Sequence, residues 1–179
     1  MLLSSIVAIA LTSPLSADSP APTAPTTAQA TAHPMTGTWR IATPEATLRK
    51  SLDGAIDGVA KEFNLLLRDL VRQKLSGATK VCTTYTLNVQ PETVQLSCDD
   101  RPTVALQRDG SPLHTQNQAG EPVRGTVQVQ GNTLRLIWQG ESGGRTNVFS
   151  LQGDTLVLQA EVRSKRIPKP LRWTVDYAR

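Results

Sequence analysis

Histidine, cysteine and aromatic residues are scarce in this chain of 179 residues. The two histidines are His33 and His114, which leaves too few for a histidine-based metal site or a catalytic triad. Gly140–Gly144 lies between expected strands and precedes no helix, which argues against a phosphate-binding loop. Asp99–Asp100 flanks an expected turn, where aspartate is common for conformational reasons. We therefore expect that the chain is not an enzyme and that it has no catalytic residue, no metal site and no cofactor.

Acidic residues are outnumbered by basic ones, which gives a net charge of +4. No basic helix and no platform of alternating basic and aromatic residues accompanies this charge, so nucleic acid is not an expected partner. Part of the charge gathers in one expected loop near the C-terminus. Its basic residues are Arg163, Lys165, Arg166, Lys169 and Arg172. This patch could dock an anionic surface or an acidic envelope protein, or it could be a solvated loop without a partner.

No apolar run is long enough to span a membrane, because Leu2–Leu11 is too short for a bilayer. Pro14 and small residues ending at Ala17 follow this run, so residues 1–17 are predicted to be a secretory signal peptide, although no lysine or arginine precedes the run. A cytosolic protein with an apolar N-terminus is the alternative. Residues 18–35 are rich in Pro, Ala and Thr and almost uncharged, which predicts a disordered linker. The mature chain is thus expected to be periplasmic or secreted, without a transmembrane span.

The two cysteines, Cys82 and Cys98, both lie in the expected mature chain. An exported compartment is oxidising, so the pair predicts a disulfide. The closed loop of about fifteen residues would contribute roughly 3 kcal/mol to stability. A turn at Gln90–Pro91 would pair Leu87 with Val94 and would place the two cysteines on opposite faces of the hairpin. We therefore expect a β-bulge at Thr83–Thr84.

A change of periodicity follows the strand expected at Gly37–Ile41. Apolar residues recur at spacings of three and four from Leu48 to Leu70, which predicts one long helix over residues 44–75. At 1.5 Å per residue this helix would be about 48 Å long, whereas a strand of ten residues covers about 33 Å. The helix must therefore overhang, bend or break. Gly54 and Gly58 are the expected break points, and the broken and continuous versions both remain open.

Turn signals set the register of the expected C-terminal strands. Turns at Gly131–Asn132, Gly143–Gly144 and Gly153–Asp154 place the apolar residues of four strands on one face. In this register Trp138 faces Gly125, which leaves room for its ring, and also faces Phe149. A slip of one residue would turn a whole strand's apolar set to the other face.

Two further strand signals complete the layout. Asp109–Gly110 predicts a hairpin that pairs Leu106 with Leu113, and Leu171–Tyr177 alternates with its odd positions inward. The predicted fold is mainly β with one long helix (α+β): an antiparallel meander of about ten strands with a helical insertion after the first strand. Closure into a barrel would remove the exposed strand edges.

The pattern Gly37-x-Trp39 resembles the start of lipocalins and fatty-acid-binding proteins, the calycin barrels. The layout of residues 36–179, a strand, a helical insertion and an unbroken run of strands, is similar to that of the fatty-acid-binding proteins. The resemblance implies a calycin-like barrel in which Arg172 or Arg179 packs beside Trp39. The last strand lacks the Arg-x-Tyr clamp of the fatty-acid-binding proteins, so the resemblance does not imply a fatty acid as the ligand.

Two functions remain after these exclusions. The first is an exported lipocalin-like binding protein of the bacterial envelope, which holds a small apolar or amphiphilic ligand behind a gating helix. The alternative is a periplasmic protein-binding module, such as a hydrolase inhibitor or an immunity-type protein, with a filled core and an exposed patch on the helix or the basic loop. The inward-facing set that would line a cavity or fill a core is Trp39, Tyr85, Trp138, Phe149, Leu158, Trp173 and Tyr177.

Overall fold

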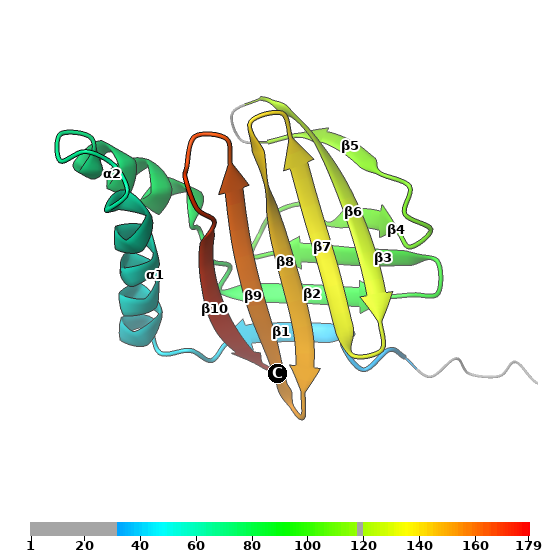
Figure 1. The fold of residues 1–179 in the computed structure, drawn as a ribbon. Helices are drawn as coiled ribbons and strands as arrows, with labels where there is room; N and C mark the ends of the chain where they lie inside the picture. The colour runs from blue at the N-terminus through cyan, green and yellow to red at the C-terminus, as the bar shows by residue number, and fades with distance from the viewer. Residues whose placement is uncertain (1–31, 118–119) are drawn as a thin grey trace, which may run out of the picture. The chain divides into compact units, whose positions relative to one another are not determined.

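A computed structural model describes residues 32–117 and 120–179, which form ten antiparallel strands in one sheet and two helices (Figure 1). This is the mainly β architecture that the sequence predicts. The signal peptide expected at residues 1–17 and most of the expected linker lie outside the described residues. The elements are β1 (Gly37–Ile41), α1 (Glu45–Ala60), α2 (Arg68–Ala78), β2 (Thr84–Val89), β3 (Thr93–Cys98), β4 (Val104–Gln107), β5 (Leu113–Gln116), β6 (Pro122–Gln130), β7 (Thr133–Gly140), β8 (Gly143–Gln152), β9 (Thr155–Ser164) and β10 (Leu171–Ala178).

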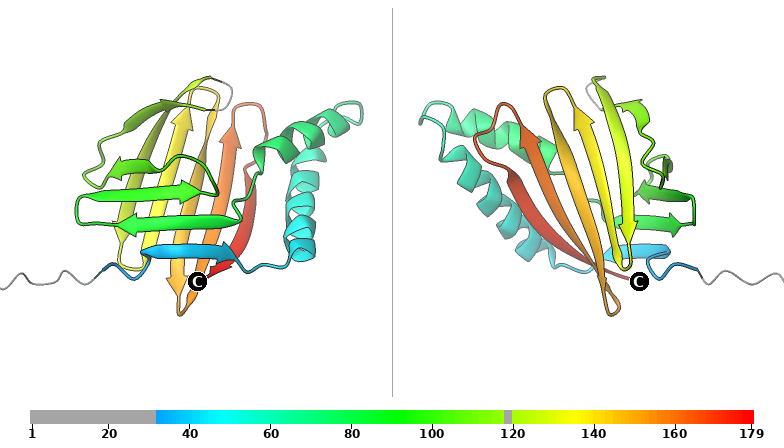
Figure 2. Two further views of the ribbon diagram at one scale, coloured as in Figure 1. Left: turned by 180° about the vertical axis from the view of Figure 1, so that it is seen from behind. Right: turned by 45° about the vertical axis from the view of Figure 1, so that its right-hand side comes forward.

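The strand order is β4-β3-β2-β1-β10-β9-β8-β7-β6-β5, so the first strand pairs with the last and the sheet curls into a nearly closed barrel. In Figure 1 the strands β1–β4 cross behind the longer strands β6–β10, and Figure 2 (left) shows them in front from the opposite side. The gap in the barrel lies between β4 and β5, which follow each other in the chain but form the two edges of the sheet.

The hairpin predicted at Asp109–Gly110 is therefore wrong. The turn itself forms, because the Asp109 carboxylate accepts a hydrogen bond from the Ser111 amide at 2.8 Å and Gly110 takes a φ of 91°. The strands on either side diverge, however, so that Leu106 pairs with Val94 and Leu113 pairs with Gly125.

The helical insertion is two helices, which is the broken version of the helix predicted over residues 44–75. α1 buries Ile56, Val59 and Ala60 and lies against β10, while α2 buries Leu75. The break covers the residues between Ala60 and Arg68 and not the expected Gly54 or Gly58, which lie within α1. Short turn hydrogen bonds replace the helical pattern here.

The registers of β6–β7 and β8–β9 are those predicted from the turns. Trp138 faces Gly125, and Phe149 faces Leu158. The register of β7–β8 differs from the prediction, because the strands connect at Glu141–Ser142 and Trp138 faces Arg145 instead of Phe149. The difference is an even number of residues, so the apolar residues stay on the predicted inner face.

The β2–β3 register also differs from the prediction by an even number of residues. Leu87 pairs with Leu96 instead of Val94, since the connection is longer than the expected two-residue turn. The disulfide between Cys82 and Cys98 forms, with a Cα–Cα distance of 5.5 Å. No bulge within the ladder is needed, because β2 begins only after Cys82 and the chain bends at Thr83.

The expected boundary between linker and barrel at residue 36 is also displaced. Met35 is fully buried, and its carbonyl accepts a hydrogen bond from the Trp39 indole nitrogen at 2.9 Å. His33 contacts the Gly131 carbonyl at 3.2 Å. The Arg179 guanidinium lies 4.6 Å from the centroid of the Trp39 ring, so Arg179 and not Arg172 takes the place beside this tryptophan. The packed chain thus begins before residue 36.

Candidate functional site

One half of the barrel interior is filled with apolar side chains. The strand register aligns Leu134, Phe149, Leu158 and Val175 in one row across β7, β8, β9 and β10, and all four are fully buried. Close packing of this kind leaves little space for a ligand without rearrangement. Phe149 and Leu158, two of the residues expected to line a cavity or to fill a core, lie in this packed row.

A different environment surrounds the row of Trp138, Arg145 and Val162, which is half-buried. We call these three residues the rim row. Arg145 occupies an inward position of β8, in alternation with the buried Asn147 and Phe149. An arginine at such a position needs polar partners, because burying a charged group is costly unless it is compensated.

The partners of Arg145 are all uncharged. Its Nε donates to the Asn147 Oδ1 at 2.9 Å, its Nη1 donates to the Lys80 carbonyl at 3.4 Å, and its guanidinium lies 5.1 Å from the centroid of the Trp173 ring. Within residues 32–117 and 120–179 it forms no ion pair with a carboxylate. Burial is the main cause that lowers the pKa of Arg145. The site thus holds a cation whose charge no carboxylate balances.

A second donor beside Arg145 is also incompletely satisfied. The indole nitrogen of Trp173 is buried, and none of the described residues accepts a hydrogen bond from it. A buried N–H without a partner in the protein destabilises a fold, so such groups are uncommon. Two donors therefore converge on one region of the interior.

Tyrosines and one phenylalanine form the wall next to these donors. Tyr85 packs edge-to-face against Phe149 at 5.1 Å and against Tyr177 at 5.3 Å, measured between ring centroids. The Tyr177 hydroxyl donates to the Cys82 carbonyl at 2.9 Å. Burial raises the pKa of both tyrosines, so their hydroxyls remain protonated and neutral.

The segment between α2 and β2 connects the helices to this site. We call residues 79–83 the strap. The carbonyls of Lys80 and Cys82 accept hydrogen bonds from Arg145 and Tyr177, and the disulfide fixes Cys82 to β3. The strap therefore holds two inward-facing polar side chains in position.

Sequence reasoning found the aromatic part of this site and missed its polar part. Tyr85, Phe149, Trp173 and Tyr177 come together in the interior, whereas Trp39 packs with Met35 and Arg179. Arg145 and Asn147 were not singled out. The alternation that placed Phe149 inward also places positions 145 and 147 inward, so the signal was present in the sequence.

Three of the five cations of the basic patch predicted at the C-terminal loop form ion pairs, but with only two carboxylates, so the patch keeps a positive charge. Arg163 and Arg172 both pair with Glu161, and Lys169 pairs with Glu62 at 2.7 Å. Only Lys165 and Arg166 of the five form no ion pair within the described residues.

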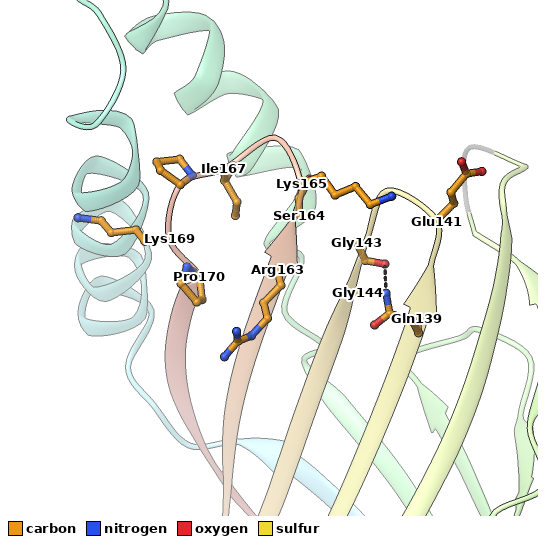
Figure 3. Close-up of a pocket in the computed structure, with 11 residues that line it drawn as sticks. Gln139, Glu141, Gly143, Gly144, Arg163, Ser164, Lys165, Ile167, Lys169 and Pro170 are labelled. Carbon is orange, nitrogen blue, oxygen red and sulfur yellow. Dashed lines mark hydrogen bonds between the residues drawn. The ribbon is translucent and has the colours of Figure 1, made fainter.

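Two grooves lie beside this loop. One of about 390 Å³ runs from the β7–β8 connection to the β9–β10 loop, and Figure 3 shows the side chains that line it. The other, of about 470 Å³, lies between Lys165 and Arg166 on one side and Glu121 and Glu141 on the other. Because acidic and basic side chains share these walls, neither groove is a strong site for an anion.

No protein-family model and no curated protein sequence matches the chain. Solved structures do match it. A secretary abundant heat soluble protein from Ramazzottius varieornatus is 12% identical, covers 83% of this chain and 97% of its own, and has a TM-score of 0.52. A fatty acid-binding protein from Drosophila melanogaster brain is 13% identical, with 79% and 96% covered and a TM-score of 0.48. A Schistosoma mansoni fatty acid binding protein in complex with arachidonic acid is 14% identical, with 80% and 94% covered and a TM-score of 0.48.

The similarity at a TM-score of 0.52 concerns the fold, because so low an identity carries no information about function. Among the described residues, neither helix, α1 or α2, is long and apolar enough to cross a membrane. The strand order, the helix pair after β1 and the gap between β4 and β5 make the described chain a nearly closed ten-stranded barrel of the calycin-like type that the sequence predicts.

Proposed function

We propose that the chain is an exported binding protein of the bacterial envelope whose barrel takes up a small amphiphile with an anionic head group. The apolar N-terminal segment with small residues before position 18 supports export to the periplasm or the medium. The barrel fold supports an apolar ligand, since folds of this type can enclose one small molecule.

Arg145 is the observation that carries the proposal. Its half-buried guanidinium faces the interior and has neutral partners only. A carboxylate or phosphate there would form a charge-assisted hydrogen bond, which is stronger than a neutral one. The Trp173 indole N–H lies in the ring on which Arg145 stacks, so the same anion could accept a hydrogen bond from it.

The apolar tail of the ligand would lie along the inner face of β7–β9. The rim row is the least buried part of this face, so Trp138 and Val162 would move aside while the filled half stays packed. The burial of tail carbons would contribute about 25 cal/mol per Å². Binding would thus combine an apolar contribution from the tail with a charge-dependent contribution from the head group.

Calorimetric titration with dodecanoate and with 1-dodecanol tests the proposal. The two probes share a tail and differ in the charge of the head group. We expect dodecanoate to bind at least tenfold more tightly, because a hydrogen bond to a charged group is worth about 1.5–3 kcal/mol. The Arg145→Gln variant, which retains a donor for Asn147, should lose this preference while it still binds 1-dodecanol.

Arg135→Gln is the matched control, because Arg135 lies on the exposed face of β7 and forms no ion pair within the described residues. It removes the same charge and should leave the preference unchanged. Equal affinity of the parent chain for the two probes would refute the role of Arg145. Failure of both probes to bind would refute uptake of this class of amphiphile.

The protein-binding module is the second candidate function, and the complete burial of Leu134, Phe149, Leu158 and Val175 favours it. A filled core needs no ligand. If neither probe binds and native mass spectrometry after exposure to a lipid extract shows no adduct, this candidate replaces the first.

A further inference from the structure

We propose that the turn between α1 and α2 docks this protein on a membrane surface that contains anionic lipid. We call residues 61–70 the leucine turn. This inference does not depend on uptake of a ligand, because it rests on the outside of the molecule.

Four leucines of this segment are exposed. The exposed fractions are 77% for Leu65, 92% for Leu66, 43% for Leu67 and 52% for Leu70. They are the large hydrophobic side chains that the described residues leave exposed. A contiguous exposed apolar patch of this kind marks an interaction site more often than an isolated apolar side chain does.

Internal hydrogen bonds hold the leucine turn in shape. The Arg68 Nε donates to the Phe63 carbonyl at 3.0 Å, and its Nη2 donates to the Lys61 carbonyl at 3.1 Å. The Asn64 Oδ1 accepts from the Leu67 amide at 3.1 Å. Phe63 packs against the core. One apolar side chain thus anchors the turn inward, while the leucines point to solvent from a fixed backbone.

The charges around the leucines favour an anionic partner. Glu62 is paired with Lys169, and Asp69 is paired with Arg72. Lys61, Arg68 and Lys74 form no ion pair with a carboxylate of the described residues. Arg72 also pairs with Asp57, so it balances only one of these two acids. The three cations outside ion pairs still leave a surplus of positive charge on and beside the leucine turn, which favours anionic lipid headgroups.

The shape of the segment favours a lipid surface over a folded partner. The connection between α1 and α2 lies at the outer end of the helix pair, away from the sheet (Figures 1 and 2). The Glu62–Lys169 ion pair joins this connection to the β9–β10 loop. A fluid bilayer can accept such an outer end between its headgroups without a complementary cavity.

A fluorescent label tests where the chain meets a bilayer. We would attach an environment-sensitive dye through Leu66→Cys in the full chain, and through Gln152→Cys as the control at the exposed β8–β9 turn. The vesicles would contain phosphatidylcholine and phosphatidylglycerol at about two to one. We expect a blue shift for the dye at position 66 and none at position 152. Residues 1–17 are common to both proteins, so they cannot produce this difference.

Substitutions separate the apolar and the charged contributions. Leu65→Ser with Leu66→Ser should weaken binding to these vesicles by more than tenfold, as measured by co-flotation, because it removes the two most exposed leucines. Lys61→Gln and Lys74→Gln should each weaken binding by about fivefold. Added salt should also weaken binding, because it screens the attraction between these cations and the lipid headgroups. Arg135→Gln, on β7, should leave binding unchanged.

Two results would overturn the proposal. A chain that floats with vesicles while the dye at position 66 stays in water would show that another segment carries the binding. A blue shift without vesicles, together with a doubled mass in sedimentation, would show that a second copy of the chain covers the leucines.

Discussion

Gly125 makes room for the Trp138 ring across the β6–β7 ladder. A Cβ at this position would collide with the six-membered part of the indole. Gly125→Ala should therefore destabilise the fold by about 1–3 kcal/mol, the usual range for overpacking, as measured by urea unfolding. Trp138 lies in the rim row and faces Arg145 on β8, so the substitution should also disturb the environment of Arg145.

A double-mutant cycle isolates this contact. Trp138→Leu removes the ring, and Gly125→Ala should then have little effect in the Trp138→Leu background. An equal loss of stability from Gly125→Ala in both backgrounds would place the cost in the backbone and not in the collision with Trp138.

At the scale of elements, Asp99 fixes the last residue of the strap and the first residue of β2 to the end of β3. One carboxylate oxygen accepts hydrogen bonds from the Thr83 amide at 2.8 Å, the Thr83 hydroxyl at 2.6 Å and the Thr84 amide at 2.9 Å. Burial alone would raise the pKa of Asp99, but these hydrogen bonds outweigh it and lower the pKa below its usual value. The carboxylate therefore works together with the disulfide one residue away.

Removal of this carboxylate should destabilise the fold at neutral pH. Asp99 has a φ of 52°, which Gly and Asn tolerate, so Asp99→Gly and Asp99→Asn avoid backbone strain. Because Asp99 is exposed, we expect a loss of about 1–2 kcal/mol for Asp99→Gly and less for Asp99→Asn, which keeps an acceptor. Urea unfolding at pH 7 measures both.

The pH dependence of the same variants gives the sign of the linkage. A carboxyl group whose pKa is lowered in the folded state stabilises the protein. This contribution is fully present above the pKa of the unfolded chain, about 3.9, and is lost as the pH falls through the pKa of the folded protein. The difference in stability between the parent chain and Asp99→Asn should therefore be constant above about pH 5 and shrink below pH 4. If the difference in stability between the parent chain and Asp99→Asn stayed unchanged down to about pH 2, protonation of Asp99 would not be the cause of the loss of stability in acid.

The faces of the strands were more predictable than their registers. Period-two alternation placed Trp138, Phe149 and Leu158 on one side, and errors in turn length left that side unchanged because they were even. The alternation does not determine how many residues connect two strands. The sequence therefore predicted the wrong partner for Phe149 on β7 and for Leu87 on β3. The hairpin at Asp109–Gly110 failed because a local turn signal cannot tell whether the strands beyond it stay together.

The position of the helix break and the polar site were missed for different reasons. The apolar stripe from Leu48 to Leu70 continues through the leucine turn, so periodicity alone predicts a helix where leucines are in fact exposed. Tertiary contacts decide this, including the Arg68 hydrogen bonds to the turn. Arg145 was predictable from its inward position on β8. An inward arginine conflicts with the expectation of an apolar wall, however, so the aromatic residues alone were predicted to line the interior.

At the scale of the whole molecule, the barrel consists of a larger sheet, β5–β10, and a smaller one, β1–β4. The two are joined by a short ladder, in which Arg40 pairs with Ala178 and Ile41 pairs with Tyr177. On the other side, β4 and β5 are not paired. The long ladders among β6, β7, β8, β9 and β10 provide most of the pairing. Few backbone hydrogen bonds therefore join these two parts of the sheet, and the shared core provides most of the contact between them.

Amide hydrogen exchange measures this difference in local stability. We expect the amides of β8 and β9 to exchange only through global unfolding, because both strands are paired on both sides and contribute fully buried residues to the core. The amides of β4 and β5 should exchange much faster, since each strand pairs on one side only, over four residues. The edge-facing amides of β4 and β5 serve as the internal control, because solvent reaches them without any opening. If the paired amides of β4 were protected as strongly as those of β8, the gap would be closed in solution, and a ligand would have to enter between the helices and the rim row instead.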